Sequence, residues 1–120
     1  MTLRRWRYTT AASADIERIT EDTLARFGEQ QARRYAQMID RAVVLVADDP
    51  DRPAARRHAE LGQGVRSLHV AFAGPRAGAA SHIVFYRTEQ RDRGQAVVVL
   101  RVLHERMDPA LHLGDEPDRP

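Results

Sequence analysis

A single glycine, Gly28, separates two segments whose apolar residues recur at helical spacing, and this arrangement constrains the fold most strongly. The recurring positions of the first segment, which begins near Ser13, are Ile16, Ile19, Leu24 and Phe27. Those of the second are Ala32, Tyr35, Ala36, Ile39, Ala42, Val43 and Val46. Glycine often ends a helix because it adopts backbone conformations that other residues avoid. The second pattern ends at Pro50, which cannot continue a helix. The two segments therefore predict an antiparallel pair of helices.

The rest of the chain carries strand patterns. Leu3, Trp6 and Tyr8 indicate a short opening strand. Residues 51–64 follow Pro50, contain Pro53 and two glycines, and are typical of a loop with one short turn of helix. Three further strands are predicted over Val65–Phe72, His82–Thr88 and Gln95–His104. The last is almost continuously apolar, as expected of a central strand covered on both faces. The order β-α-α-β-β-β predicts an α+β domain with the helical hairpin packed on one face of a mainly antiparallel sheet.

Length and composition favour one soluble domain. With 120 residues the chain can bury a core of its own, and we assign residues 1–108 to the domain and 109–120 to an acidic, flexible tail. The absence of cysteine excludes disulfides and thiolate zinc sites and fits the cytoplasm. The N-terminal segment has no apolar stretch behind its arginines, and no run is long enough to cross a membrane.

All 19 basic side chains are arginines. The net charge is +2 and the segment from Asp108 to Pro120 carries −3, so residues 1–107 carry +5. Such a body suits an acidic partner, whether nucleic acid or protein, because guanidinium groups bind phosphate and carboxylate alike. The alternative is a compositional preference for arginine that leaves only a solvated surface.

Arg101 interrupts the most apolar strand, and a partly buried guanidinium needs either a structural carboxylate or a ligand beside it. We favour the structural ion pair over catalysis. In a regular strand Val99, Arg101 and Leu103 would share one face, and His104 would lie on the other.

The segment His104-Glu-Arg-Met-Asp108 gathers an imidazole, two carboxylates and a guanidinium, a combination suited to acid–base chemistry. Alternatively, His104 and Asp108 bind each other or backbone groups where the chain leaves the sheet. Tyr86, beside Arg87, is either a core residue or part of an RNA-cutting site. The histidine spacing predicts no metal site, and no serine lies in a strand-turn-helix elbow.

Several motifs occur together in a characteristic order along the chain. They are Ala14-Asp-Ile-Glu-Arg-Ile19, Arg26-Phe-Gly28, Asp49-Pro50, Gly64-Val-Arg-Ser-Leu68, Ile83-Val-Phe-Tyr-Arg87 and Leu100-Arg-Val-Leu-His-Glu-Arg-Met-Asp108. Together they resemble the ParE branch of the RelE/ParE toxin superfamily, from Tyr8 to Asp108. The resemblance implies the toxin of a type II toxin–antitoxin pair with a RelE-like fold. Its implied partners are a ParD-like antitoxin and DNA gyrase, with DNA contacted only indirectly and no cofactor required.

The same resemblance separates two mechanisms. RelE-type members cut messenger RNA on the ribosome with basic residues and usually a tyrosine near the C-terminus, whereas ParE-type members poison gyrase without being enzymes. Here the chain after Asp108 has no tyrosine and is acidic, which favours the ParE type. We expect Arg66, Arg87 and Arg101 to face carboxylates of the antitoxin. Tyr86, His104, Met107 and Asp108 are expected to be structural residues of the family motif.

Two rival functions remain open. One is a RelE-like ribonuclease that uses Arg87, Arg101 and either Tyr86 or His104. The other is an inactive protein that keeps the toxin fold only as a binding module.

Overall fold

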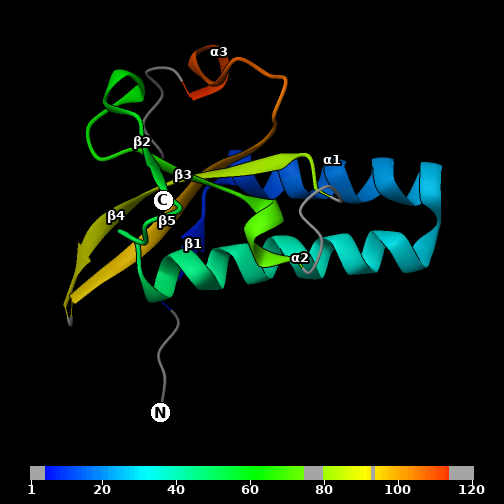
Figure 1. Cartoon of the computed structure of the whole chain (residues 1–120), viewed down its shortest axis with the longest axis horizontal. Helices are drawn as coiled ribbons and strands as arrows, with labels where there is room; N and C mark the ends of the chain where they lie inside the picture. The colour runs from blue at the N-terminus through cyan, green and yellow to red at the C-terminus, as the bar shows by residue number, and fades with distance from the viewer. Residues whose placement is uncertain (1–4, 75–79, 93, 114–120) are drawn as a thin grey trace.

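The computed structural model describes residues 5–74, 80–92 and 94–113 (Figure 1). Its elements follow the predicted order, with short additions. The helices and 3-10 turns are α1 (Thr10–Phe27), α2 (Glu29–Asp48), η1 (Ala59–Leu61), η2 (Val70–Ala73) and α3 (Pro109–Leu113). The strands are β1 (Trp6–Tyr8), β2 (Arg56–Arg57), β3 (Arg66–His69), β4 (His82–Arg91) and β5 (Gly94–His104). The chain is thus an α+β protein, as predicted.

The strands form one sheet in the order β1-β5-β4-β3-β2. All neighbouring strands are antiparallel except β1, which lies parallel to β5. The longest strands, β4 and β5, form a hairpin at the centre of the sheet. This position explains why β5 is largely apolar, since β1 and β4 flank it and most of its residues are buried.

The hairpin of α1 and α2 covers one face of the sheet, which we call the inner face (Figure 1). Thr9 caps α1 by accepting a hydrogen bond from the Ala12 amide, and Gly28 separates the two helices with a φ of 89°, as its position in the sequence predicts. The core of the inner face joins residues of α2 to alternate residues of the strands. They include Ile39, Val43, Val46, Leu68, Val84, Tyr86, Val97, Val99 and Val102.

One strand prediction was wrong at its end, and one predicted loop contains a short strand besides its predicted helical turn, η1. The predicted strand over Val65–Phe72 ends at His69, because the imidazole Nδ1 of His69 accepts a hydrogen bond from the Ala71 amide and starts the 3-10 turn η2. As a result Phe72 does not reach the core, and 62% of its surface is exposed. The loop predicted over residues 51–64 contains a two-residue edge strand, β2. The opening strand is present over Trp6–Tyr8, and Leu3 lies outside the described residues.

A bulge in β5 changes which residues share a face. Phe85 pairs with Arg101 and Tyr86 pairs with Val99, which leaves Leu100 as the extra residue. The prediction that Val99 and Arg101 share a face was therefore wrong. Val99 lies in the inner core, whereas Leu100 and Leu103 belong to a smaller cluster on the opposite, outer face.

The described part of the chain covers the outer face only partly. A small cluster there brings Leu61 of η1 and Leu113 of α3 against Val65, Phe85 and Leu103. Residues 109–113, which we had assigned to the tail, thus form a helix packed on the sheet, and residues 114–120 lie outside the described part of the chain. Within the described ranges, no helix combines the length and apolar character needed to cross a membrane.

Candidate functional site

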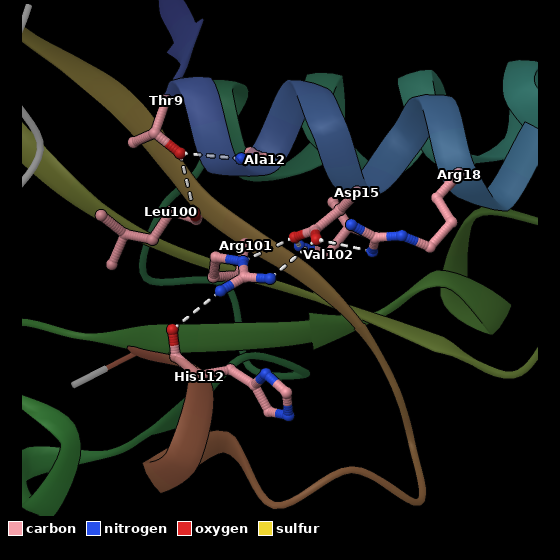
Figure 2. Close-up of polar contacts among 8 residues, drawn as sticks. All are labelled: Thr9, Ala12, Asp15, Arg18, Leu100, Arg101, Val102 and His112. Carbon is pink, nitrogen blue, oxygen red and sulfur yellow. Dashed lines mark hydrogen bonds and ion pairs between the residues drawn. The ribbon is translucent and has the colours of Figure 1, made fainter.

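Arg101 lies at the centre of a polar cluster between the sheet and α1 (Figure 2). Its Nε donates to Oδ2 of Asp15 at 2.7 Å, and its Nη2 donates to Oδ1 at 2.8 Å, so that the two side chains form a bidentate ion pair. Asp15 is 2% exposed and Arg101 is 21% exposed. The hydrogen bonds to Asp15 raise the pKa of Arg101 above its ordinary value, which keeps the guanidinium charged. The ion pair that the sequence favoured is present.

The cluster also holds three elements together. Oδ2 of Asp15 accepts the backbone N–H of Val102 at 3.0 Å, on the edge of β5 beyond the end of β1. Nη1 of Arg101 donates to the carbonyl of His112 at 2.9 Å, which ties α3 to the sheet (Figure 2). Thr9 donates its hydroxyl to the Leu100 carbonyl at the bulge. Arg101 is therefore already engaged by its own chain on both sides of the sheet.

Arg66 lies on the inner face, opposite Tyr86 in the ladder. Its Nη2 contacts Oδ1 of Asp51 at 3.1 Å, and its Nη1 donates to the Pro50 carbonyl. The hydroxyl of Tyr86 donates to the same carbonyl at 2.6 Å. Burial raises the pKa of Tyr86 to about 12, so its hydroxyl keeps the proton that it donates. These contacts fix the chain where it leaves α2.

Arg87 lies on the outer face, where it pairs across the sheet with Val98. Among the described residues it makes no hydrogen bond and no ion pair through its side chain. Neighbouring Glu89 is held by Arg7, with Nε to Oε2 at 3.0 Å, and by Arg91 at 2.9 Å. The hydrogen bond from Arg7 is the main reason why the pKa of Glu89 falls to about 2. This end of the outer face therefore carries a surplus of guanidinium groups.

The structure does not bring the three predicted arginines onto one surface. Arg66 pairs with Tyr86, the residue before Arg87, so Arg66 and Arg87 lie on opposite faces of the sheet. Arg101 lies on the outer face, as Arg87 does. The three arginines that we expect to face the antitoxin therefore do not form one basic surface. Whether each arginine contacts a partner stays a prediction, with Arg87 the least engaged by its own chain.

The other motif residues bind backbone groups or line the surface. Nδ1 of His104 accepts the Arg106 amide, and Oδ1 of Asp108 accepts the Ala110 amide at the start of α3. The rings of His104 and His82 are 5.3 Å apart on the inner face. His104 and Asp108 thus shape the exit from the sheet through backbone contacts, as one of the two interpretations held. Met107 is 44% exposed.

A pocket of about 360 Å³ opens on the outer face beside β2 and β3. Sequence reasoning missed it, because its residues come from four separate segments of the chain. His58 Nε2 lies 2.7 Å from Ser67 Oγ, and His58 Nδ1 lies 3.3 Å from Glu60 Oε2. A serine, a histidine and a carboxylate in this order are also the side chains of a serine nucleophile with its base. Ser67, however, lies in a strand that is paired on both sides, so the backbone amides around it bind neighbouring strands and cannot stabilise an oxyanion. Across residues 5–74, 80–92 and 94–113, no three potential metal ligands gather.

Comparison with known proteins places this architecture in a defined class. In the solved structure "Chromosomal ParDE TA system from P. aeruginosa", a chain superposes with a TM-score of 0.64, with 84% of this chain and 95% of that chain covered. The sequence identity is 20%, so this likeness concerns the fold alone. The two-helix hairpin on a mostly antiparallel sheet is thus the fold of a ParDE toxin.

The sequence comparisons identify the family. A family model described as "ParE toxin of type II toxin-antitoxin system, parDE" matches residues 6–109. The chain is 30% identical over 112 residues to Toxin ParE1 of Caulobacter vibrioides, which covers 93% of this chain and 100% of the relative. It is 33% identical over 105 residues to Toxin ParE1 of Mycobacterium tuberculosis, with 87% and 92% covered. The chain belongs to the ParE toxin family of type II toxin–antitoxin systems.

Proposed function

We propose that this ParE-family toxin poisons DNA gyrase by binding rather than by catalysis, in the cytoplasm, and that a ParD-like antitoxin neutralises it. One observation carries the non-enzymatic part. Of the residues available to a nuclease, Arg87 and Arg101 lie on the outer face of the sheet and Tyr86 lies on the inner face. His104 packs its ring against His82 and also lines the outer-face pocket. A phosphodiester in contact with Arg87 would have the sheet between itself and Tyr86, so these two groups have no common reaction centre.

The engagement of these side chains supports the same conclusion. A general base or acid must lie within hydrogen-bond reach of the proton that it transfers. Tyr86 is fully buried and donates its hydroxyl to Pro50, while Arg101 is held by Asp15 and the His112 carbonyl. Neither group is free to act on RNA without breaking contacts that hold the fold together.

The charge distribution supports an acidic antitoxin. Residues 1–107 carry a net charge of +5, and Arg87 with its neighbours on β1 and β4 presents guanidinium groups at one end of the outer face. An acidic segment that folds on binding gains charge-assisted contacts there and is steered towards the toxin. The antitoxin would thus form a hetero-oligomer with this chain.

Controlled expression of the toxin alone tests the proposal. We expect growth arrest with induction of the SOS response, and inhibition of supercoiling when purified toxin is added to purified gyrase and plasmid DNA. Co-expression of the product of the adjacent reading frame should restore growth. Cleaved transcripts without DNA damage would show a RelE-like ribonuclease instead. Antitoxin binding with no effect on growth would show an inactive binding module.

A further inference from the structure

The pocket on the outer face has an apolar interior and lies apart from the Arg87 end of the sheet. Ile83 and Phe85 of β4 line it, together with Phe72 and Met107. Phe72 belongs to η2, whereas Met107 follows β5, so the two side chains come from unconnected segments. Both are large apolar groups with high exposure, at 62% and 44%. Clustered exposed apolar groups of this kind mark binding sites.

The polar groups of the pocket are already satisfied by one another. His58 is bonded to Ser67 and Glu60, and His69 Nε2 lies 2.8 Å from Oε1 of Glu105. The His69 Nδ1 also accepts the Ala71 amide. Because these groups need no ligand, the surface that gains most from being covered is apolar.

Arg56 differs from the other polar residues of the pocket in its contacts. It lines the pocket, and its side chain forms neither a hydrogen bond nor an ion pair with any described residue, although its charge helps to lower the pKa of nearby Glu60. Its neighbour Arg57 contacts Asp51 at 3.5 Å instead. A carboxylate placed beside an apolar group in the pocket would therefore find a guanidinium partner in Arg56.

We propose that this pocket is the anchor site for the antitoxin, which inserts one aromatic or large aliphatic side chain between Phe72 and Met107 and places an adjacent carboxylate on Arg56. The volume suits one or two side chains rather than a whole helix, and the free guanidinium selects an acidic segment. The inference rests on the proposed neutralisation by an antitoxin. The antitoxin would then contact the outer face at two places, the pocket and the end that carries Arg87.

Titration of the purified toxin with the labelled product of the adjacent reading frame tests the anchor. We expect Phe72→Ala and Met107→Ala each to raise the Kd about tenfold or more, and Arg56→Ala to raise it about fivefold. The chain supplies matched controls in Phe27→Ala at the end of α1, with 66% exposure, Leu111→Ala in α3 and Arg57→Ala. These should change the Kd by less than about twofold. All six side chains are substantially exposed, so thermal unfolding should confirm that each variant folds.

The outcomes separate the anchor from the proposed function. If the wild-type toxin does not bind the adjacent product, neutralisation by that protein fails, and the anchor fails with it. If the wild type binds but the pocket variants bind equally well, only the anchor is overturned. It is also overturned if the pocket variants lose growth inhibition while keeping antitoxin affinity, which would assign the pocket to the target. Loss of a toxin dimer on sedimentation would assign it to self-association and overturn the anchor as well.

Discussion

The two faces of the sheet differ in what covers them. On the inner face, two long helices bury a continuous core in which Ile39, Val43, Val84 and Val99 are almost inaccessible. On the outer face, the covering elements among the described residues are the short η1 and α3, which contribute to a cluster whose buried members are Val65, Phe85 and Leu103. The remaining outer surface carries arginines and the pocket.

This difference teaches how a small domain separates stability from recognition. Burial of apolar surface is the main favourable term in folding, and the inner face supplies most of it. Because the outer face contributes less to the core, it can expose Phe72, Met107 and Arg87 without loss of the fold. Substitutions should therefore affect unfolding on one face and binding on the other.

The largest expected effect is at Asp15, which connects the two faces. Asp15→Ala leaves Arg101 without its carboxylate and the Val102 amide without its acceptor. Removing one member of such a buried pair costs about 3–5 kcal/mol. We expect a loss of this size in the free energy of unfolding measured with urea. Asp22→Ala, at an exposed position of the same helix, is the control and should change the stability by about 0.5 kcal/mol or less. A loss below about 1 kcal/mol at Asp15 would show that the pair is dispensable.

A matched pair of leucines compares the faces directly. Leu68 is 1% exposed in the inner core, whereas Leu113 is partly buried at the outer cluster. We expect Leu68→Ala to cost about 3 kcal/mol, since it creates a cavity that neighbours cannot fill. Leu113→Ala should cost about 1 kcal/mol, because α3 can shift or remain partly solvated. Equal losses in chemical denaturation would contradict the division of roles between the faces.

The parts of the fold that were predictable from the sequence depend on local patterns. Helical spacing on either side of Gly28 and the apolar run through Val97–Val99 are properties of neighbouring residues, so the hairpin and central strand were predicted. The partner of Arg101 was not, because Asp15 is 86 positions away along the chain. The bulge at Leu100 reverses the alternation after it, and no residue type announces that reversal.

The candidate site shows the same limit more strongly. His58 and Ser67 are nine positions apart, yet they meet only because β2 pairs with β3. The predicted strand includes Phe72, but the hydrogen bond from the Ala71 amide to His69 ends the strand before that residue. Exposed apolar groups are therefore hard to find from periodicity, since the pattern that predicts burial is broken by one local hydrogen bond.

The third prediction concerns pH and the inner face. Burial lowers the pKa of His82 from 6.5 to about 4, and Tyr35 Oη lies 2.7 Å from its Nδ1. Between pH 6.5 and about pH 4, the unfolded chain therefore binds a proton at His82 that the folded chain does not bind. The free energy of unfolding consequently falls as the pH decreases through this range. We expect a loss on the order of 2 kcal/mol between pH 7 and pH 4.5 that is absent in His82→Gln.

The ion pair of Arg7 and Glu89 on the outer face titrates at lower pH than His82, so their contributions to stability can be measured separately. Arg7 lowers the pKa of Glu89 to about 2, so the stabilisation by that ion pair is present above about pH 4.5 and is lost as the pH falls towards 2. The control is Glu89→Gln, which should keep the loss between pH 7 and pH 4.5. A wild-type curve that is flat down to pH 4.5 would exclude the role of His82.

The smallest expected effect, at Tyr86, bears most directly on mechanism. Tyr86→Phe removes one hydrogen bond to the Pro50 carbonyl, which keeps the contact from Arg66, and should cost about 1 kcal/mol in thermal or urea unfolding. Because the ring stays in the inner core, the fold and the outer face should be unchanged. If the toxin acts by binding, this variant should arrest growth as strongly as the wild type at equal folded concentration. A ribonuclease that relies on Tyr86 would instead lose activity by far more than the loss of folded protein explains, and that result would place the reaction on the inner side of the sheet.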